Sequence, residues 1–416
     1  MNCRFKSLLL AGTVVLVAGC DQKQSESQAT ANTDYQKQLV TQLINAKPGD
    51  VIDIPAGTYA FNRGLSLTVD GVTLRGQGMD KTILSFKDQI QGAEGLFVRA
   101  NDFTIEDLAI EDAKGDALKV NEGRNIVIRR VRTEWTNGPD EKNGAYGIYP
   151  VQTENTLIDG AVAIGAADAG IYVGQSKRVI VRNSRAEFNV AGIEIEHTQF
   201  ADVYDNVAVN NTGGILVFNM PNLPQPGFGT RVFNNIIKTN NTKNFAPKGA
   251  IVASVPAGSG IVINSNDQVE IFDNEMSDNK TAHVIISSYF TTGYVKELEA
   301  VKDFDAYPES IFIYNNTYGP GGNSPDHLDL KALKLMEFGL NGHLPEVLWD
   351  GYVDEAKLEN GALPSPLKIC VQEQTAGIIN VDAPGGFKNI STDIAPHECE
   401  LPKLEPVALQ GALANL

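Results

Sequence analysis

Hydrophobic and polar residues alternate in short segments between residues 71 and 318, and each segment ends in a small polar or charged residue. The segments recur about every 23 residues, with longer intervals where extra residues interrupt the repeat. The closing positions are Gly76, Asp107, Arg130, Gly160, Asn183, Asn206, Asn235, Asn274 and Asn316. Alternation with a period of two is typical of β-strands, and self-similarity at this spacing is typical of stacked structural units. The pattern therefore predicts an all-β solenoid of stacked parallel strands.

A second strand-like segment follows in each repeat, usually after Gly or Ala. We expect its first column of apolar residues to point inward: Leu118, Ile148, Ile171, Ile193, Ile215, Ile251 and Val284. The next residue on each coil then points outward: Lys119, Tyr149, Tyr172, Glu194, Leu216, Val252 and Ile285. Preceding small residues are expected to form a flat outer floor: Gly147, Gly170, Gly192 and Gly214. Because stacked strands lie ~4.8 Å apart, successive members of the outward column are predicted to be neighbours.

The repeated asparagines have a structural interpretation. Asparagine tolerates left-handed backbone geometry at bends, and its side chain hydrogen-bonds to nearby backbone groups. Equivalent asparagines on successive coils form an amide ladder when they stack in register. We therefore expect Asn183, Asn206, Asn235, Asn274 and Asn316 to hold the fold rather than to perform chemistry.

The two ends of the solenoid carry different patterns. Residues 34–47 place Leu39, Val40, Leu43 and Ile44 at helical spacing, which predicts a helix that caps the first coil. The β-helix with this cap is expected over residues 34–320. Residues 321–416 lack a clear repeat and are expected to form an irregular C-terminal cap, with a helix at residues 331–338.

The first residues of the chain have the features of an export signal. Arg4 and Lys6 precede an apolar stretch, Leu8–Val17, that is too short to span a membrane. The following Leu-Val-Ala-Gly-Cys sequence resembles a bacterial lipobox, which implies a signal peptide over residues 1–19 and lipidation of Cys20. Residues 20–33 then form a flexible tether. The expected location is the bacterial cell envelope, periplasm-facing and attached to a membrane only through the lipid, with inner and outer membrane both open.

Two cysteines remain beyond the anchor. In an oxidising compartment Cys370 and Cys399 are expected to form a disulfide rather than two free thiols. The bond would close a loop of roughly 30 residues and stabilise the C-terminal region.

The net charge of the chain argues against a nucleic-acid partner. The chain has 34 basic and 51 acidic residues, a formal charge of −17, and thus no basic stripe to neutralise nucleic-acid phosphates. It shows no glycine-rich phosphate loop, no serine-nucleophile elbow and no zinc-spaced His/Glu motif, so we expect neither a cofactor nor a transition metal. An acidic stretch at residues 102–112 leaves a structural or catalytic Ca²⁺ open, although turn and surface roles also explain it.

Four insertions interrupt the repeat, and loops of this length are often functional. They are Trp135–Asn143, Met220–Gly229, Asn244–Gly260 and Tyr289–Pro308. A lid or a partner-binding surface would explain them equally well.

The chemistry is expected on the outward columns. Glu194 and Glu196 lie two residues apart on one strand and could act as acids, while His197 titrates near neutrality. The candidate catalytic residues are His197, Glu194, Glu196 and Tyr172, and the candidate substrate-binding residues are Lys119, Tyr149, Tyr172, Asp168, Gln175 and Asn219. Tyrosine rings stack on sugars, and Lys119 could pair with a uronate carboxylate. A solvated sheet face stabilised by cross-strand pairs is the alternative interpretation.

Three segments carry a family resemblance: residues 168–175, 190–196 and 212–218. Together with the capping segment and the repeat, they resemble right-handed parallel β-helix proteins of the pectin-lyase-like superfamily, and more narrowly a family of exported bacterial β-helix lipoproteins. The superfamily includes polysaccharide lyases, mannuronan epimerases, glycoside hydrolases and nonenzymatic proteins. The narrower resemblance implies fold and export but supplies no catalytic set. The sequence also departs from the arginine-centred motif of pectate lyases and from the paired aspartates of polygalacturonases.

Two functional hypotheses from different classes follow. The first is a lyase or epimerase of an acidic polysaccharide, in which Lys119 neutralises the substrate carboxylate and His197 or a tyrosine moves the proton. The alternative is a noncatalytic lipoprotein that binds a glycan or an envelope protein. A glycoside hydrolase that uses Glu194 and Glu196 is a third possibility.

Overall fold

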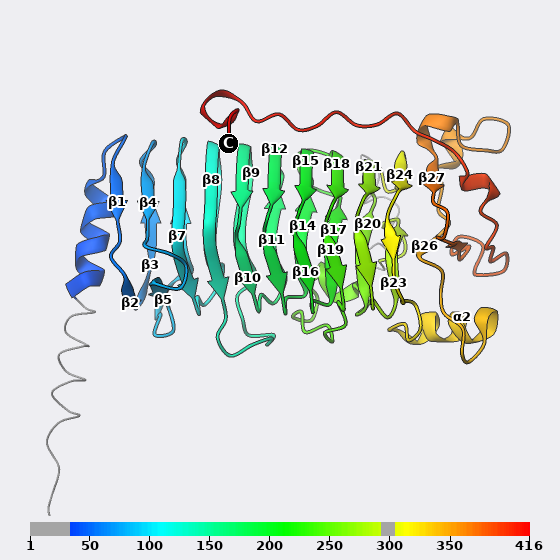
Figure 1. Ribbon diagram of the computed structural model, residues 1–416, viewed down its shortest axis with the longest axis horizontal. Helices are drawn as coiled ribbons and strands as arrows, with labels where there is room; N and C mark the ends of the chain where they lie inside the picture. The colour runs from blue at the N-terminus through cyan, green and yellow to red at the C-terminus, as the bar shows by residue number, and fades with distance from the viewer. Residues whose placement is uncertain (1–33, 293–303) are drawn as a thin grey trace, which may run out of the picture.

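The computed structural model describes residues 34–292 and 304–416. Within them, 28 parallel strands form one continuous coil, in which each strand pairs with its equivalent one turn later (Figure 1). The predicted all-β solenoid is confirmed. The predicted signal peptide, tether and lipidated Cys20 lie outside the described residues. None of the helices in the described part of the chain is long and apolar enough to cross a membrane.

Each complete coil contributes one strand to each of three faces. The first, here called the site face, contains β3 (Arg63–Leu67), β6 (Gln91–Val98), the start of β8 (Leu118–Glu134) and of β9 (Tyr146–Asp159), β11 (Ala169–Gly174), β14 (Ala191–Glu196), β17 (Gly213–Phe218), β20 (Ser259–Asn264), β23 (Ala282–Ser287), β26 (Val347–Trp349) and β28 (Ile378–Asn380).

The second, here called the tail face, contains β1 (Val51–Asp53), β4 (Thr73–Arg75), the start of β7 (Thr104–Glu111), the middle of β8, the end of β9, β12 (Lys177–Arg182), β15 (Gln199–Tyr204), β18 (Phe228–Phe233), β21 (Asp267–Phe272), β24 (Ile311–Tyr314) and β27 (Ile369–Gln372). The third face contains β2 (Gly57–Ala60), β5 (Thr82–Ser85), the ends of β7 and β8, β10 (Val162–Ile164), β13 (Arg185–Glu187), β16 (Val207–Val209), β19 (Ile236–Lys238), β22 (Glu275–Ser277) and β25 (Thr317–Tyr318).

The inward column of the site face is the spine of the core. Ile148, Ile171, Ile193 and Ile215 are fully buried and pair in register, as predicted. Ile251 was assigned to this column wrongly, because it lies in a short 3₁₀ helix, η1 (Ile251–Ser254), and Ile261 pairs with Ile215 instead. The outward residue of that coil is accordingly Val262 and not Val252. The segments that contain Ile251 and Ile261 are both apolar, and β20 starts only after the inserted loop has ended.

The predicted amide ladder is present. Asn206, Asn235, Asn274 and Asn316 are buried, and each Nδ2 donates to the Oδ1 of the next at 3.0, 3.0 and 2.9 Å. Asn183 was placed in this ladder wrongly. It sits one residue earlier, at a left-handed bend with φ 51°, and Ser184 takes the buried position by donating its N–H to Asn206 Oδ1.

A second amide ladder lies at another bend and was not predicted. It contains Asn189, Asn211, Asn240 and Asn279, again linked from Nδ2 to Oδ1. The strands before this bend are three residues long, which gives too little alternation to align them by sequence.

This second ladder explains the glycine column. A Cβ at Gly170, Gly192 or Gly214 would lie 2.6, 2.8 or 2.9 Å from an asparagine Nδ2 of the ladder. The prediction of an outward glycine floor is therefore wrong. Glycine is required because the backbone of the site face passes directly over buried amides, where no side chain fits.

The N-terminal cap matches its prediction in part. Residues 34–45 are helical, and Leu39 and Leu43 are buried against the first coil. Ile44 was expected on the same apolar face but is 72% exposed.

The C-terminal region continues the coil beyond residue 320, where the repeat was expected to end. β26, β27 and β28 add to the site and tail faces, so the stacked strands reach Asn380. Helix α2 (Leu328–Phe338) covers the segment predicted to be helical. Insertions interrupt the sequence repeat in these coils. They contain two short 3₁₀ helices, η3 (Glu355–Lys357) and η4 (Ser365–Leu367).

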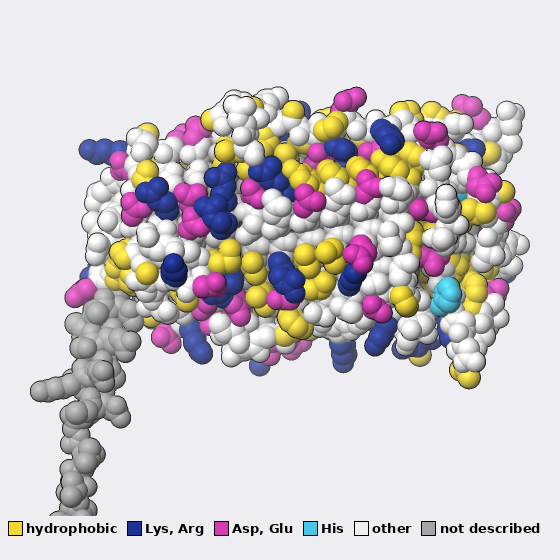
Figure 2. All heavy atoms as spheres, in the orientation of Figure 1, with side chains coloured by type: hydrophobic (Ala, Val, Ile, Leu, Met, Phe, Trp, Pro, Cys, Tyr) yellow, Lys and Arg dark blue, Asp and Glu magenta, His cyan; other side chains and the backbone are white. Residues whose placement is uncertain are grey.

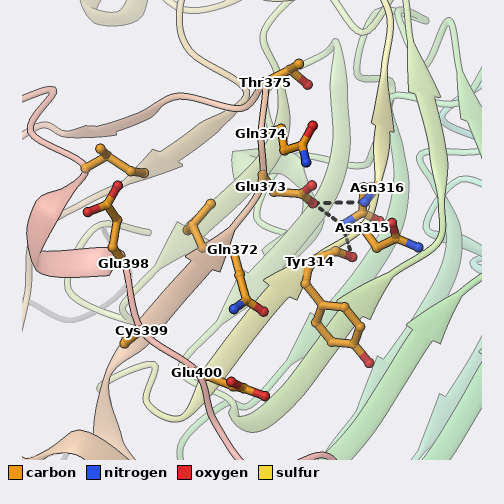
Figure 3. A pocket seen from close by; sticks show the side chains of 12 residues that line it. Tyr314, Asn315, Asn316, Gln372, Glu373, Gln374, Thr375, Glu398, Cys399 and Glu400 are labelled. Atoms are coloured by element: carbon orange, nitrogen blue, oxygen red, sulfur yellow. Dashed lines mark hydrogen bonds between the residues drawn. The ribbon is translucent and has the colours of Figure 1, made fainter.

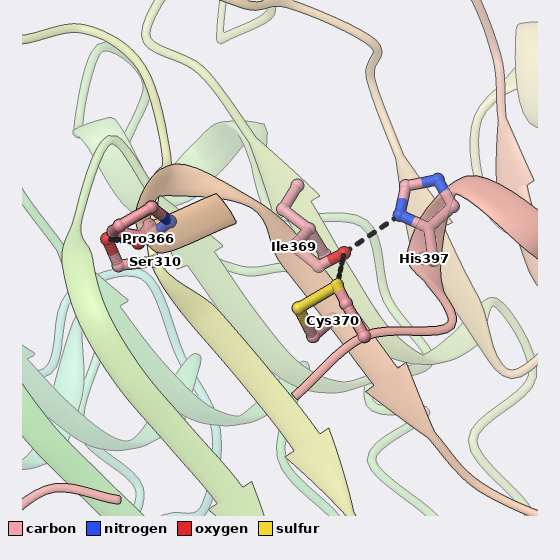
Figure 4. Close-up of a disulfide and its surroundings, with 6 residues drawn as sticks. Ser310, Pro366, Ile369, Cys370 and His397 are labelled. Carbon is pink, nitrogen blue, oxygen red and sulfur yellow. Dashed lines mark hydrogen bonds between the residues drawn. A yellow bond between two sulfur atoms is a disulfide. The ribbon is translucent and has the colours of Figure 1, made fainter. Parts of the chain in front are cut away.

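Cys370 and Cys399 form the disulfide expected from the sequence, with Cα atoms 5.0 Å apart (Figure 4). It joins β27 to the segment that follows η5 (Ala395–His397), where His397 also hydrogen-bonds the Ile369 carbonyl at 3.0 Å. The bond thus fixes the start of the C-terminal tail to the last coil of the tail face.

The tail, residues 400–416, then runs back along the tail face as far as β8 and β9 (Figure 1). Val407 N–H donates to Asp202 Oδ2 at 3.1 Å, and Gln410 exchanges two hydrogen bonds with Asn155. Leu409 and Leu413, the latter in η6 (Gly411–Leu413), pack on apolar side chains of β8, β9 and β12. The tail thereby covers much of this face.

Candidate functional site

The strand register places the predicted outward residues on one surface. Lys119 pairs with Tyr149, and Tyr172 pairs with Glu194. The pairing of Ile148 with Ile171 makes Tyr149 and Tyr172 neighbours on adjacent coils. The four side chains therefore form one row across β8, β9, β11 and β14.

Three tyrosine rings pack together in this row. The ring centroids of Tyr146, Tyr149 and Tyr172 are 4.5, 4.5 and 4.9 Å apart. Tyr172 is buried, whereas Tyr146 and Tyr149 are half-buried and reach solvent. Tyr146 was missed by sequence reasoning, because strict alternation would turn it inward. Its strand partner is Ala169 of the outer surface, and the regular alternation fails at the intervening Gly147.

Three carboxyl groups lie against these rings. Tyr172 Oη donates to Glu196 Oε2 at 3.0 Å. Glu194 is buried on the same strand, and Asp168 and Glu196 are partly exposed. We refer to Asp168, Glu194 and Glu196 with Tyr146, Tyr149 and Tyr172 as the carboxylate–tyrosine cluster.

The carboxyl groups of the cluster resist ionisation. Burial raises the pKa of Glu194 well above its ordinary value, and the charges of Asp168 and Glu196 add to the effect. Burial, followed by the charge of Glu196, raises the pKa of Asp168 to about 7. Burial also raises the pKa of Glu196 to about 7, against the hydrogen bond from Tyr172. Near neutral pH the cluster therefore holds both protonated and ionised carboxyls.

No cation compensates these acids. Among the described residues, no lysine or arginine contributes to the pKa of Asp168, Glu194 or Glu196. Lys119 instead lies 3.6 Å from Asp116 Oδ2, with its Nζ 4.7 Å from the centroid of the Tyr149 ring. Glu194 Oε2 is buried and has no hydrogen-bond partner in the described structure. The carboxyl of Glu194 thus has one oxygen whose hydrogen-bonding capacity is unused in the described structure.

His197 lies next to Glu196 in sequence but is used elsewhere. It is 1% exposed, its Nδ1 lies 2.6 Å from the Gln225 carbonyl oxygen, and its Nε2 accepts the Met220 N–H at 2.6 Å. Burial lowers its pKa, so the ring is neutral and donates from Nδ1. Both nitrogens therefore hold the Met220–Gly229 loop, and the structure leaves neither of them free for the predicted catalytic role.

Two predicted binding residues also have internal partners. Asn219 is buried and braces the same loop through two hydrogen bonds to the backbone of Gly227. Gln175 lies at a bend with φ 49°, where its Oε1 accepts from Gln152 Nε2 at 3.1 Å. The structure therefore gives both side chains partners other than the cluster. At each bend the chain shifts by one residue, so the side chain that follows the bend points toward the Met220–Gly229 loop. The alternation of apolar and polar residues does not reveal this shift.

Two of the insertions flank the site face. Residues of Trp135–Asn143 and of the segment that opens Asn244–Gly260 line a cavity of about 570 Å³, which includes Asp140, Lys142 and Phe245. Phe245 also packs against the outer apolar cluster to which Tyr172 belongs. The Met220–Gly229 insertion is pinned by His197, and most of Tyr289–Pro308 lies outside the described residues.

The described residues offer no arrangement of three or more His, Cys, Asp or Glu side chains that could hold a metal ion. In the acidic stretch at residues 102–112, Asp107 pairs with Arg130 at 2.6 Å and Asp112 accepts from Thr136. These aspartates link neighbouring coils.

Another cavity, of about 930 Å³, opens at the C-terminal end of the coil (Figure 3). Glu373, Glu398 and Glu400 line it, and Glu373 Oε1 accepts from the Asn316 N–H, from Asn316 Nδ2 and from Tyr318 Oη. Glu373 therefore terminates the first amide ladder, and its carboxylate is already occupied.

Comparison with known proteins agrees with this architecture. The sequence of residues 66–223 matches the family described as the right handed beta helix region. The fold is a right-handed parallel β-helix. No curated protein matches the sequence.

Several solved structures are similar in fold. The A-module of mannuronan C-5 epimerase AlgE4 from Azotobacter vinelandii is 20% identical, with a TM-score of 0.47 over 66% of this chain and 81% of that chain. DFA-IIIase from Arthrobacter chlorophenolicus is 9% identical, with a TM-score of 0.45 over 76% and 87%. Alginate lyase from a Paenibacillus species is 14% identical, with a TM-score of 0.30 over 68% and 95%. At these identities the likeness concerns the fold alone.

Proposed function

We propose that the carboxylate–tyrosine cluster is the active site of a glycan-cleaving enzyme that works by carboxyl acid–base chemistry. The observation that carries the proposal is that three carboxyls lie together without a cation among the described residues, and one of them, Glu194, is buried with an unpartnered oxygen. Such an arrangement costs folding free energy, because a buried polar group without a partner loses its hydration. Strongly raised carboxyl pKa values together with this geometry are typical of catalytic sites.

The residues divide into roles by their environment. Burial favours the protonated form of Glu194, which makes it the proton donor to the leaving oxygen of a glycosidic bond. The ionised member of the Asp168 and Glu196 pair serves as the base that activates water or as the nucleophile. Tyr172 orients Glu196 through its hydrogen bond. Tyr146 and Tyr149, which reach solvent, supply ring surface on which a sugar stacks.

The charge of the cluster favours an uncharged glycan. A uronate carboxylate would meet three acids, and the one lysine of the row is already paired with Asp116. Elimination or epimerisation of an acidic glycan requires a positive group at the substrate carboxylate, so the cluster suits hydrolysis better. This reverses the order of the two enzymatic hypotheses drawn from the sequence.

One observation keeps the lyase or epimerase as a second candidate. Lys119 stands at the end of the same row, beside Tyr149, and its side chain is 23% exposed. A uronate carboxylate that displaced Asp116 would pair with the Lys119 ammonium, and Tyr149 would transfer the proton. We regard noncatalytic glycan binding through the three tyrosines as the remaining alternative.

The test is incubation of the tether-free protein with neutral polysaccharides and uronate polymers. Hydrolysis yields new reducing ends without ultraviolet absorbance, a lyase yields absorbing unsaturated ends, and an epimerase exchanges a sugar-carbon proton with solvent deuterium. We expect reducing ends from a neutral glycan. Unsaturated ends or exchange would replace hydrolysis by the second candidate, and binding without any product would show that the cluster is not catalytic.

We further propose that the protein acts in the bacterial envelope, attached through a lipid on Cys20 and facing the periplasm. The lipobox-like sequence supports this. The Cys20→Ser variant should move from the membrane fraction to the soluble fraction and lose incorporation of labelled palmitate. Membrane retention and labelling equal to the parent protein would contradict the anchor.

A further inference from the structure

The site face carries a second concave feature, a pocket of about 400 Å³ that we call the apolar pocket. Its floor is the continuation of the outward column that contains Glu194: Val262, Ile285 and Leu348 are all buried there. The walls come from α2, from the insertion that contains η1 and from the segment after β28. Pockets of this size typically bind small molecules or parts of larger ones.

The apolar pocket is aligned with the carboxylate–tyrosine cluster. Glu194 pairs with Leu216, and Leu216 pairs with Val262, so the pocket floor begins two coils from Glu194. At ~4.8 Å per coil this separation is about 10 Å. Phe218 connects the two regions, because it is the strand partner of Glu196 and also lines the pocket.

The buried carboxyl group of the pocket is already satisfied. Asp350 is 1% exposed, and its Oδ2 accepts from the Ser288 N–H, from Ser288 Oγ and from Thr291 Oγ1. Its Oδ1 accepts from the Tyr352 N–H. Asp350 therefore holds the pocket wall in place, and both of its carboxylate oxygens already accept hydrogen bonds from the protein. The floor available to a ligand is apolar, while His327 and Asp329 stand exposed where α2 begins.

Apolar side chains also stand exposed at the mouth. The Phe387 ring is 59% exposed, although its backbone has φ 61°, a conformation that is costly for a bulky residue. Leu330 of α2, which is half-buried, also lines the pocket. An apolar pocket with exposed apolar side chains at its entrance is typical of a binding site.

We propose that the apolar pocket binds an alkyl or acyl substituent of the glycan on which the cluster acts, so that the substrate is amphiphilic. The inference rests on the proposed function, because the register aligns the pocket with the acid–base residues. The sugar would lie over the tyrosines, and the substituent would pass Phe218 into the pocket. The pocket floor has no charges and begins about two coils from Glu194. Both features suit an alkyl or acyl chain that is linked near the reacting sugar.

Binding of short alkyl glucosides tests the pocket without requiring turnover. We expect hexyl glucoside, below its micelle-forming concentration, to bind in calorimetry, while methyl glucoside gives no measurable heat. In a series from butyl to hexyl, each added methylene should tighten binding by roughly fourfold until the pocket is full. Equal affinity along the series would overturn the proposal.

Two variants locate the binding. Ala383→Trp places a large ring in the half-buried wall and should weaken hexyl glucoside binding by at least about tenfold. Phe387→Ala, at an exposed position, should weaken it by roughly threefold to tenfold without affecting folding. Phe188→Ala is the matched control, because Phe188 is also exposed, 39%, with φ 59°. Unchanged binding in both pocket variants, or equal weakening in the control, would contradict this site.

The failure of this inference can be told apart from that of the proposed function. Glu194→Gln should lower cleavage by about 10²–10⁴-fold and leave hexyl glucoside binding unchanged. Cleavage of a neutral glycan without chain-length-dependent binding would leave the enzyme and remove the pocket. Chain-length-dependent binding without any cleavage would leave the pocket and remove the enzyme.

Discussion

The outer surfaces of the site face and the tail face both bury carboxyl groups, but they treat the charge differently. On the tail face, Arg231 lies between Asp202 at 3.0 Å and Glu270 at 3.4 Å. On the site face, Glu194 and its two acidic neighbours have no basic partner among the described residues. The same coil thus holds one set of acids that shares a cation and another set that does not.

The tail face is also covered by a segment of the chain itself. The C-terminal tail covers the tail face and donates the Val407 N–H to Asp202. Arg231 also lies over the rings of Phe233 and Phe272, at 4.8 and 5.5 Å from their centroids. These rings belong to a half-buried stack of Tyr204, Phe233, Phe272 and Tyr314, and Figure 2 shows apolar side chains gathered along β15 to β24 beneath the tail. Asp202 and Glu270 thus share a cation beneath the tail, which the acids of the site face lack among the described residues.

The largest effect should come from Glu194→Gln. Removal of the proton donor is expected to lower kcat/KM on a cleaved glycan by about 10²–10⁴-fold. The unfolding free energy at pH 7 should stay equal or rise, because Gln replaces a protonated acid of similar shape. Kinetics and urea denaturation measure the two effects. Glu122→Gln, in an exposed pair with Arg99, is the control and should change neither. A large loss of stability with Glu194→Gln would show that the site face is structural, like the tail face.

Arg231→Met should have the opposite profile. It leaves Asp202 and Glu270 buried without their cation, which is expected to cost about 3–5 kcal/mol of unfolding free energy. Denaturant titration measures the loss, and glycan cleavage by the folded protein should be unaffected. Arg185→Met breaks an exposed pair with Glu187 and should cost less than about 1 kcal/mol. Equal effects of the two substitutions would mean that burial of the pair is unimportant.

Replacing Cys370 and Cys399 together by serine should loosen the tail at its start. The loop between them spans 29 residues, for which the expected loss is about 2–4 kcal/mol. Amide hydrogen exchange should increase in residues 400–416 and remain unchanged on the site face. Uniform loss of protection over both faces would show that they are not independent.

The pH dependence of stability should reveal the unpaired acids. The folded-state pKa of Glu196 is raised to about 7, so the folded protein binds more protons than the unfolded chain between about pH 4.5 and 7. The parent protein should lose stability relative to Glu196→Gln as pH rises through this window, by about 2 kcal/mol after allowance for its partial exposure. Denaturation of both proteins at several pH values gives the difference. A constant difference would mean that Glu196 titrates normally.

The smallest effect should come from Tyr172→Phe, which removes only the hydrogen bond to Glu196. The expected cost is about 1 kcal/mol of stability. Because that hydrogen bond lowers the pKa of Glu196, its loss should move the acidic limb of the kcat/KM profile to higher pH. An unshifted profile would show that Tyr172 does not tune Glu196.

Sequence reasoning worked where a local period decided the structure. The repeat predicted the parallel coil, and alternation placed Tyr149, Tyr172 and Glu194 on one face, since side-chain direction in a strand depends only on position. The amide ladder followed from recurring asparagines, although Asn183 was one residue out of register. Errors arose where the chain bends, because left-handed residues such as Asn183 and His197 interrupt the alternation.

The sequence by itself determined the stacking axis, the inward column and the row of tyrosines and acids, because each depends on spacing along the chain. Only the tertiary structure decided which acids have partners. Arg231 reaches Asp202 across 29 residues, Val407 reaches it across 205, and His197 is pinned by a loop that the repeat does not specify. Pairing and burial depend on what folds over a face, and for that reason the chemistry of Glu194 became visible only in three dimensions.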